Sequence, residues 1–467
     1  MHKLFVGAVL ASIVALVASA AASSSPPAFS NQILRAPAVV PGVTTSPPGQ
    51  SGDSEPAIDF GGPDNTMVVD GLGWLPFAVN LWKGHFGDTP PQFFGAMDTS
   101  LPIQGNGRTN QGDGDADVEV TSAGTVLLAD LDIIFNHTGS NAQTGVSITR
   151  CPATATSKAD CTSTLLDTAG ADRPWLTTSG TTAYVSWHNS GSSSQITVDR
   201  STDDGRTWTR VASPFLGQGK VAGNATFNNS IGPIVADPFN PNVVYQPFAS
   251  GEASVQKGTS GAYNNIYVAR STDGGNTWTD TLVFHEPLFT DLANFWPTAT
   301  VDIANGDVYV AFTDRSTVWL SSSSDLGESW TTTALSGTPP TVVMPWVAAM
   351  GGKVDVVYYG TSPAAANVGG TLGDENTVWN TYDTQRSGGT WNTAVVSNSP
   401  NRVGPVCLNG SACAGNVNRE LLDLFEVAEN PADGKAAIIY TETTTDTWTG
   451  SDGVTHELPE IVLAYEQ

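Results

Sequence analysis

Apolar and β-branched residues recur along the whole chain in short runs, which are separated by Gly, Asn, Asp and Pro. No sustained helical periodicity of apolar positions interrupts these runs. Short runs of β-branched and aromatic residues between turn residues are typical of strands. The pattern therefore predicts an all-β protein.

The runs fall into a triplet that repeats. Its middle member is the clearest and occurs at Thr66–Asp70, Thr125–Asp130, Thr182–Trp187, Asn242–Pro247, Asp307–Phe312, Lys353–Tyr358 and Lys435–Tyr440. A third run follows each middle run, and an opening strand, often with Pro near its start, precedes it. These seven units of roughly 60 residues lie near the period range that indicates propellers or solenoids.

The repeat predicts a single β-propeller of four-stranded antiparallel blades. Seven blades is the count we favour, and six is the alternative, because units one and seven are the most degenerate. The last unit stops after its third run, so we expect a strand from the N-terminal region, around Gln32–Val40, to complete its blade. The propeller domain then spans 51–467, and a low-complexity segment with the closing strand spans 21–50.

The N-terminus has the features of a secretory signal peptide. His2 and Lys3 precede an apolar stretch, Leu4–Val17, which is too short to span a bilayer. Small residues follow it and end at Ala20, so we expect residues 1–20 to be cleaved near Ala20 and the mature protein to be secreted.

The four cysteines are compatible with export. Cys151 and Cys161 lie ten residues apart, and Cys407 and Cys413 lie six apart. Each pair is placed to close a small disulfide loop in an oxidising compartment.

The charge excludes two classes of partner. The chain has 45 acidic side chains and 19 Lys and Arg, and its net charge is −26. Binding to nucleic-acid phosphates or to an anionic membrane requires a basic surface. We therefore expect a monomer that binds no nucleic acid and does not insert into a membrane.

One motif recurs after the third run of units three, four and five. Its shared Ser, Asp, Gly and Trp are Ser201, Asp203, Gly205 and Trp208, then Ser271, Asp273, Gly275 and Trp278, then Ser323, Asp325, Gly327 and Trp330. Asp accepts hydrogen bonds from backbone N–H groups and Gly adopts a positive φ, so the motif predicts a hairpin turn with the Trp packed on the blade.

This S-x-D-x-G-x-[ST]-W pattern resembles the Asp-box, or bacterial neuraminidase repeat, of the sialidase superfamily. The resemblance implies a sialidase-type propeller in which the box is structural. It also implies that the box lies between the third and fourth strands, on the face opposite the active site. The box Asp residues are therefore not expected to be catalytic.

The opposite face is the expected place of a site. It carries the entries to the innermost strands and the loops between second and third strands, which are long at 130–143, 247–264, 359–376 and 442–459. Long loops on a rigid scaffold often carry function. The central depression of this face is thus the predicted site.

An acidic comb opens unit two. Asp113, Asp115, Asp117 and Glu119 alternate, so a strand would place all four on one side. Such a comb suits a hard cation such as Ca²⁺, bound by Asp113, Asp115 and Asp117, or supplies an acid and a base. The alternative, which we prefer, is a solvated acidic turn. We expect that the protein requires no cofactor. A structural Ca²⁺ is the one metal ion that the sequence suggests.

Sialidases use three Arg to hold the substrate carboxylate, a Tyr nucleophile with a Glu, and an Asp acid. The matching candidates on the predicted face are Arg173, Arg315 and Arg419; Tyr358 or Tyr359 with Glu442; and Asp115 or Asp117. Guanidinium groups grip carboxylates in a bidentate manner. Four tryptophans at or near this face are either sugar-stacking platforms or propeller core: Trp74, Trp175, Trp296 and Trp346.

Two functions follow for this chain. The one we slightly prefer is a secreted exo-glycosidase that acts on sialic-acid-type or related glycans. The alternative is a non-catalytic propeller that binds a glycan or a protein, as other Asp-box proteins such as sortilins do. A glycan or glycoconjugate is the expected partner of the enzyme, whose three Arg should converge near a Tyr–Glu contact.

Overall fold

The computed structural model describes residues 25–37, 52–73, 79–97, 102–103, 108–135, 142–168, 170–189, 195–214, 229–251, 263–287, 290–292, 295–408, 418–449 and 453–467. Apart from one short 3-10 helix, η1 (Lys158–Asp160), the regular elements of these residues are strands. The all-β prediction is therefore confirmed. No helix in this part of the chain is long and apolar enough to cross a membrane. The predicted signal peptide, 1–20, lies outside the described residues.

Seven antiparallel sheets hold four or five strands each, and we number them in chain order. Sheet one contains β2 (Asp53–Ser54), β3 (Ile58–Gly61), β4 (Thr66–Gly73), β5 (Val79–Gly84) and β6 (Gln92–Ala96). Sheet two contains β7 (Pro102–Ile103), β8 (Arg108–Val120), β9 (Val126–Phe135), β10 (Ala142–Cys151) and β11 (Thr162–Asp167). Sheet three contains β12 (Ala171–Ser179), β13 (Thr182–Asn189), β14 (Gln195–Ser201) and β15 (Thr209–Arg210).

The remaining sheets complete the chain. Sheet four contains β16 (Asn229–Ile231), β17 (Val235–Ala236), β18 (Val244–Ser250), β19 (Asn265–Ser271) and β20 (Thr279–His285). Sheet five contains β21 (Thr298–Val301), β22 (Val308–Thr313), β23 (Val318–Ser323) and β24 (Thr331–Ala334). Sheet six contains β25 (Thr341–Met350), β26 (Lys353–Thr361), β29 (Val378–Ser387), β30 (Thr390–Val395) and β31 (Arg402–Val403). Sheet seven contains β33 (Glu426–Glu429), β34 (Ala436–Thr449), β35 (Thr455–Glu466) and β1 (Phe29–Leu34).

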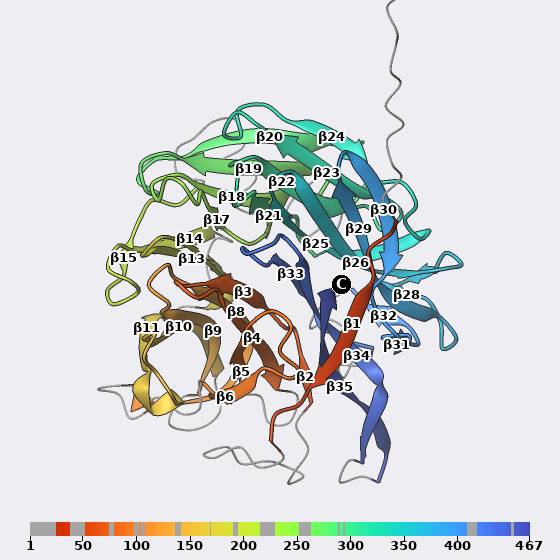
Figure 1. The fold of residues 1–467 in the computed structure, drawn as a ribbon, viewed down its shortest axis with the longest axis horizontal. Coiled ribbons are helices and arrows are strands. Elements are labelled where there is room, and N and C mark those ends of the chain that lie inside the picture. Colours follow the sequence, from red (N-terminus) through yellow and green to blue (C-terminus); the bar gives the residue numbers. More distant parts are fainter. Residues whose placement is uncertain are drawn as a thin grey trace, which may run out of the picture.

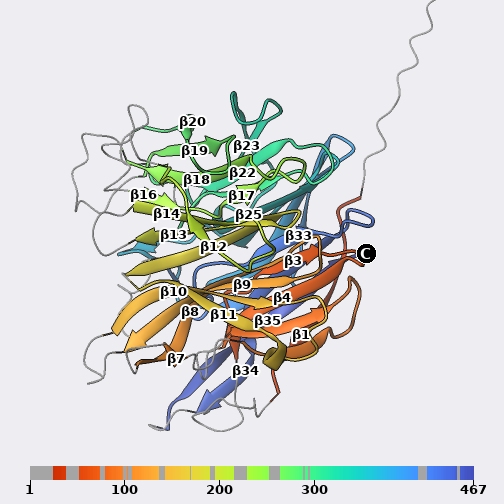
Figure 2. The ribbon, with the colours of Figure 1, turned by 90° about the vertical axis from the view of Figure 1, so that its left-hand side faces the viewer.

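The sheets stand around a common centre, as a propeller (Figures 1 and 2). The innermost strands contact one another in the order β3, β8, β12, β17, β21, β25 and β33, and β33 returns to β3. A small eighth sheet, made of β27 (Asn367–Val368), β28 (Thr371–Leu372) and β32 (Val406–Cys407), lies outside this order. The propeller fold is confirmed, and each sequence unit supplies one larger sheet. The blade count itself stays a prediction.

The N-terminal strand completes the last sheet, as predicted. β1 pairs antiparallel with β35, from Phe29 opposite Glu466 to Leu34 opposite Ile461. The strand ends before the predicted limit of Val40, since Pro37 has no N–H with which to continue the ladder. The two ends of the chain thus tie one sheet together (Figure 1).

An ion pair follows directly after β1. Arg35 donates from Nε and Nη2 to the two carboxylate oxygens of Glu460, both at 2.8 Å, and from Nη2 to Asp446 at 2.7 Å. Burial raises the pKa of Glu460 to about 8, although Arg35 opposes this shift. Arg35 therefore holds the buried carboxyl group of Glu460 with two hydrogen bonds at the point where the ring closes.

We expect Arg35→Met to lower the free energy of unfolding by about 1–3 kcal/mol, because it leaves the buried Glu460 carboxylate without its charged partner. Urea denaturation followed by tryptophan fluorescence measures this loss. Arg206→Met, at an exposed arginine of the first motif copy, is the matched control. An equal, small effect of both variants would show that the ion pair does not secure the closure.

The three motif copies adopt the same hydrogen-bonded turn between the third and fourth strands of sheets three, four and five. In the second copy, Asp273 Oδ1 accepts from the Thr277 N–H at 2.8 Å and Asp273 Oδ2 accepts from Thr277 Oγ1 at 2.8 Å. Gly275 has a φ of +87° and its N–H donates to Ser271 Oγ. The Trp278 indole donates to the Gly275 carbonyl at 3.1 Å. The predicted hairpin geometry is present.

Asp273→Ala removes both acceptors of this turn at once. We expect a loss of about 1–2 kcal/mol in unfolding free energy, similar to the loss of a helix-capping Asp. Thermal unfolding measures it, with Asp64→Ala, an exposed Asp that accepts one hydrogen bond from Thr66 Oγ1, as control. If Asp273→Ala and Asp64→Ala unfold at the same temperature, the hydrogen bonds of the turn contribute nothing to stability.

The structure bears on both predicted disulfides. Cys151 and Cys161 form a disulfide, and Cys407 is disulfide-bonded, while its predicted partner Cys413 lies outside the described residues.

Two segments that we predicted to be long loops, 130–143 and 442–459, are largely strand in the structure. β9 and β10 extend into the first segment, and β34 and β35 extend into the second. Their Thr-rich and β-branched sequences suit extended strands, and β34 and β35 project as a long hairpin (Figure 1).

Candidate active site

Three of the innermost strands, β8, β12 and β25, are interrupted where they enter the channel. The pairing of β12 shifts register between Asp172 and Trp175, and that of β25 shifts between Val343 and Trp346. The pairing of β8 shifts between Asp113 and Ala116. Such irregularities turn side chains away from the ladder and are common beside active sites. Here they turn the strand entries toward the channel axis.

Left-handed backbone marks the same level. Five non-glycine residues at the entries of inner strands have φ between +45° and +54°: Glu55, Arg173, Phe295, Met344 and Leu422. This conformation costs about 1–2 kcal/mol per residue and concentrates at functional sites. The repetition at equivalent positions of five sheets indicates that the ring imposes it.

A charged group occupies the centre of this level, on the face opposite the motif turns. It consists of Glu55, Asp115, Asp172, Arg173, Arg419 and Asp423, and we call it the central cluster. The Asp423 N–H donates to Glu55 Oε1 at 2.8 Å. Arg419 Nη2 donates to Asp423 Oδ1 at 3.0 Å. Sheets one, two, three and seven thus meet through these side chains.

Burial controls the ionisation of two of these acids. It raises the pKa of Asp115 to about 7, and the nearby Asp172 carboxylate raises it further. It raises the pKa of Glu55 well above its usual value, with added repulsion from Asp115 and Asp423. Asp115 is therefore a carboxylic acid that still carries its proton near neutral pH.

Arg173 is the cation best placed to meet a ligand. Its guanidinium carbon lies 4.6 Å from the ring centre of Trp296, a favourable cation–π distance. No hydrogen bond to this guanidinium is formed by the described residues. Arg419 Nε is likewise buried without a partner among them. With respect to the described residues, both arginines therefore have donors that a bound anion could satisfy.

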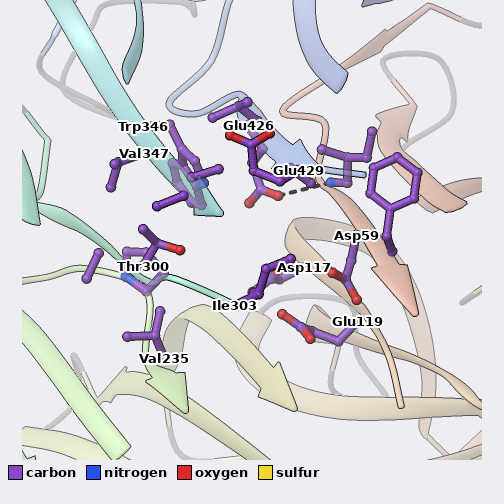
Figure 3. A pocket seen from close by; sticks show the side chains of 18 of the residues that line it. Asp59, Asp117, Glu119, Val235, Thr300, Ile303, Trp346, Val347, Glu426 and Glu429 are labelled. Atoms are coloured by element: carbon purple, nitrogen blue, oxygen red, sulfur yellow. Dashed lines mark hydrogen bonds between the residues drawn. The ribbon is translucent and has the colours of Figure 1, made fainter. Parts of the chain in front are cut away.

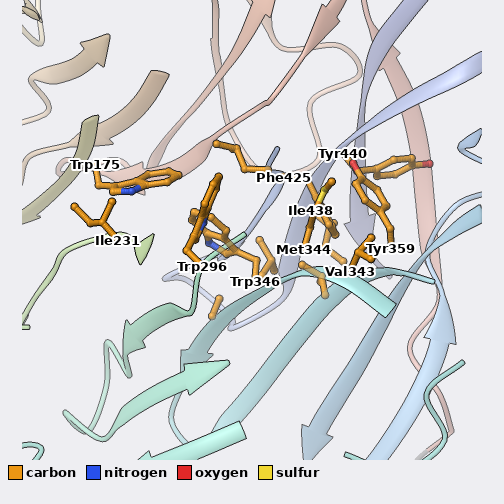
Figure 4. Packing of buried hydrophobic residues seen from close by; sticks show 14 of the residues in the cluster. Trp175, Ile231, Trp296, Val343, Met344, Trp346, Tyr359, Phe425, Ile438 and Tyr440 are labelled. Carbon is orange, nitrogen blue, oxygen red and sulfur yellow. The ribbon is translucent and has the colours of Figure 1, made fainter. Parts of the chain in front are cut away.

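Three tryptophans of the inner strands or their entries lie together in the buried hydrophobic core (Figure 4). Trp175 packs edge-on against Trp296 with ring centres 5.3 Å apart and lies 5.8 Å from Trp346. All three are buried. They belong to the hydrophobic core, the second of the two predicted roles, and Trp296 also contacts Arg173. Trp74 lies outside the described residues.

The third candidate arginine is offset from the centre. Arg315 pairs with Asp291 at 3.7 Å. Tyr263 is influenced by the charges of both Asp291 and Arg173, and burial raises its pKa. Arg315 is thus linked to the central cluster through its neighbours, and it makes no contact with Asp423 or Asp115.

The structure does not bring the candidate nucleophile pair to the centre. Tyr358 is fully buried, with its hydroxyl 2.7 Å from Thr384 Oγ1. Tyr359 stacks on Phe425 at 4.1 Å and accepts a hydrogen bond from the Thr441 N–H. Burial raises the pKa of both tyrosines, which disfavours a phenolate.

Glu442 faces another cavity, between the N-terminal strand and sheet six. Its Oε2 accepts from the Thr444 N–H at 2.9 Å.

The acidic comb of β8 is divided between two places. Asp115 joins the central cluster, whereas Asp117 and Glu119 line a cavity deeper in the channel. The side chain of Asp113 lies outside the described part. Among the described residues, no three His, Cys, Asp or Glu side chains are arranged to hold a metal ion.

Sequence reasoning missed Asp423, Tyr263 and Asp291 as site residues. Asp423 lies at the start of the last unit, at a position equivalent to those of Asp115 and Arg173. The strand repeat could therefore have identified it as a site residue. Tyr263 and Asp291 lie in connections between strands, where the repeat gives no register.

The comparisons with known proteins give fold likeness at low identity. No protein-family model matches the chain, and no curated protein matches it. A GH93 α-L-arabinofuranosidase of Fusarium graminearum, in complex with arabinobiose, is 13% identical over 66% of this chain and 88% of its own, with a TM-score of 0.44. Trypanosoma rangeli sialidase with the inhibitor DANA is 11% identical over 79% and 58%, with a TM-score of 0.43. A PL25 ulvan lyase bound to a GlcA–Rha3S oligosaccharide is 12% identical over 88% and 93%, with a TM-score of 0.49.

Proposed function

We propose that this chain is a secreted glycoside-cleaving propeller whose central cluster binds a sugar that bears a carboxylate, of the sialic-acid or uronic-acid type. The observation that carries the proposal is the pairing, in one buried group, of a protonated acid with guanidinium donors that no described residue occupies. A carboxylate-bearing sugar supplies the acceptors that these guanidinium donors lack.

The roles follow from the environment of each group. Asp115 protonates the leaving oxygen, because its pKa of about 7 keeps a proton available. Asp172, whose charge acts on Asp115, takes a proton from the water that attacks the anomeric carbon while the bond to the leaving oxygen breaks. Glycosidases generally work with such a pair of carboxyl groups. Arg173 and Arg419 hold the sugar carboxylate.

The tyrosine-nucleophile chemistry inferred from the sialidase resemblance has less support than the acid pair. Tyr263 is the tyrosine beside Arg173, and the raised pKa of its hydroxyl opposes ionisation. A non-catalytic glycan-binding role stays the second candidate. The observation in its favour is that Arg419 is already bonded to Asp423, as in a structural ion pair.

Fluorogenic glycosides test the proposal. We expect the mature chain to release 4-methylumbelliferone from its N-acetylneuraminide or β-glucuronide, and Arg173→Met to raise KM for that substrate about tenfold or more. Arg206→Met, on the other face, should match the wild type. Glycan binding without release would establish the non-catalytic role, and neither release nor binding would refute both.

A further inference from the structure

A second acidic site lies in the channel, away from the central cluster. It is a cavity of about 160 Å³, which we call the channel cavity. Its acidic lining residues are Asp59, Asp117, Glu119, Glu426 and Glu429 (Figure 3). Ile303 and Pro431, in turns between first and second strands, lie at its edge, and Ile303 is 39% exposed. The cavity therefore belongs to the face of the motif turns.

Trp346 separates the channel cavity from the central cluster. It lines this cavity and also a smaller one that includes Asp423. Trp175 packs against Trp346, and Trp296 packs against Trp175, so buried indole rings lie between the two acidic groups. A ligand of the channel cavity must therefore enter from the motif face, independently of the glycan site.

The described lining of the channel cavity carries no positive charge. Among the residues that the structure describes, no Lys, Arg or His lines the cavity. The cation nearest to it, Lys353, is held by Glu429 at 3.1 Å, Glu466 at 3.0 Å and Asp355 at 2.5 Å. Glu429 is thus neutralised, whereas the described residues offer no cation to the other four carboxyl groups. Asp70, whose charge also acts on Glu426, adds further negative charge.

Backbone and hydroxyl donors fix these carboxyl groups in place. Asp59 accepts from the Val120 N–H at 2.7 Å, and Asp117 accepts from the Leu176 N–H at 2.7 Å. Glu119 accepts from Thr178 Oγ1 at 3.0 Å, and Glu426 accepts from the Ile58 N–H at 2.9 Å. Asp59 and Glu119 also share a side-chain hydrogen bond. The four carboxyl groups are therefore held in fixed positions in the lining of the cavity.

One carboxyl oxygen in the lining of the channel cavity accepts no hydrogen bond from the described residues. Glu426 lines the channel cavity and is 5% exposed, and its Oε1 has no hydrogen-bond partner in the described part of the chain. A buried polar atom without a partner costs about 1–3 kcal/mol, so proteins rarely keep one unless a ligand or water completes it. Together with the absence of a counter-charge, this atom points to a bound cation.

We propose that the channel cavity binds a guanidinium group, presented by a small molecule or by an arginine side chain. A metal ion fits poorly, because the described acids do not converge as a metal-binding group. A guanidinium carries donors in several directions, which suits several carboxyl groups that line one cavity. It is also weakly hydrated and flat, so it is less costly to bury beside the apolar Val235 and Val347.

Binding should be linked to proton release. Burial raises the pKa of Asp59 and Asp117 to about 7 and that of Glu119 and Glu426 well above the usual value. The empty cavity therefore holds protons at slightly acidic pH, and a guanidinium group displaces them to the buffer as the carboxylates ionise around it.

Calorimetric titration with methylguanidinium at about pH 6 tests the proposal. Repeating it in phosphate and in imidazole, which differ in ionisation enthalpy, counts the protons released. We expect saturable binding with net proton release. The tripeptide acetyl-Gly-Arg-Gly-amide identifies the source: if it binds at least as tightly as the ion, the ligand is an arginine side chain, and if the ion alone binds, it is a small molecule.

Two variants keep the test specific. Glu426→Gln and Glu119→Gln preserve shape and should each weaken methylguanidinium binding about tenfold and reduce proton release. Glu328→Gln, an exposed acid on the same face, should bind like the wild type. The proposal is overturned if neither probe binds, if Ca²⁺ binds in their place, or if the three variants bind alike. Glycosidase activity should be unaffected, so failure here leaves the proposed function untouched.

Discussion

Asp115→Asn is expected to lower kcat for glycoside cleavage by about 10²–10⁴, the usual contribution of a general acid. Asn keeps the shape of the protonated side chain but cannot deliver a proton to the leaving oxygen. Binding should survive, because Arg173 and Arg419 still hold the sugar carboxylate, and KM should change little. Steady-state kinetics on the fluorogenic substrate separate the two constants.

The pH profile gives a second check on the same acid. Asp115 works only in its protonated form, so wild-type kcat/KM, which reports the free enzyme, should fall as pH rises through about 7. That limb should vanish in Asp115→Asn, while Asp64→Asn, an exposed carboxyl outside the cluster, should keep it. If Asp115→Asn keeps kcat within about threefold of the wild-type value, Asp115 is not the acid.

The sequence predicts the sheets well because their middle strands are buried on both sides. Lys353–Tyr358 is observed within β26 and Asp307–Phe312 almost coincides with β22. Such strands read as continuous apolar runs between turn residues. The innermost strands carry less pattern, since β2 with β3 and β16 with β17 are broken in two where they enter the channel.

The candidate site is predicted in part. Asp115, Arg173 and Arg419 stand at equivalent strand entries, so the repeat brings them together before any coordinates are known. The repeat cannot show which way a side chain turns, and Tyr358 and Tyr359 pack into the apolar layers between blades. Residues with a positive φ stand at the strand entries that carry the central cluster. We attribute their conformation to closure of the ring, and a local sequence pattern does not predict it.

We expect the folded protein to be most stable in mild acid and to lose stability as pH rises from about 4 to about 7 and beyond. The reason is a set of buried acids whose pKa burial raises, to about 7 for Asp59, Asp115 and Asp117 and well above the usual value for Glu55, Glu119 and Glu426. The unfolded chain releases these protons near pH 4, so the native state binds more protons throughout this window. Each shift to about 7 corresponds to about 4 kcal/mol.

Below pH 4 the motif turns act in the opposite direction. Hydrogen bonds from Ser329 lower the pKa of Asp325 to about 2, so its contribution is lost as pH falls toward that value. Urea midpoints measured between about pH 3 and about pH 8 should therefore pass through a maximum near pH 4–5. Asp117→Asn should flatten the alkaline side, since the amide cannot ionise in the channel, whereas Asp64→Asn should not. Midpoints that rise steadily to pH 8 would mean that water or a bound cation already compensates the channel acids.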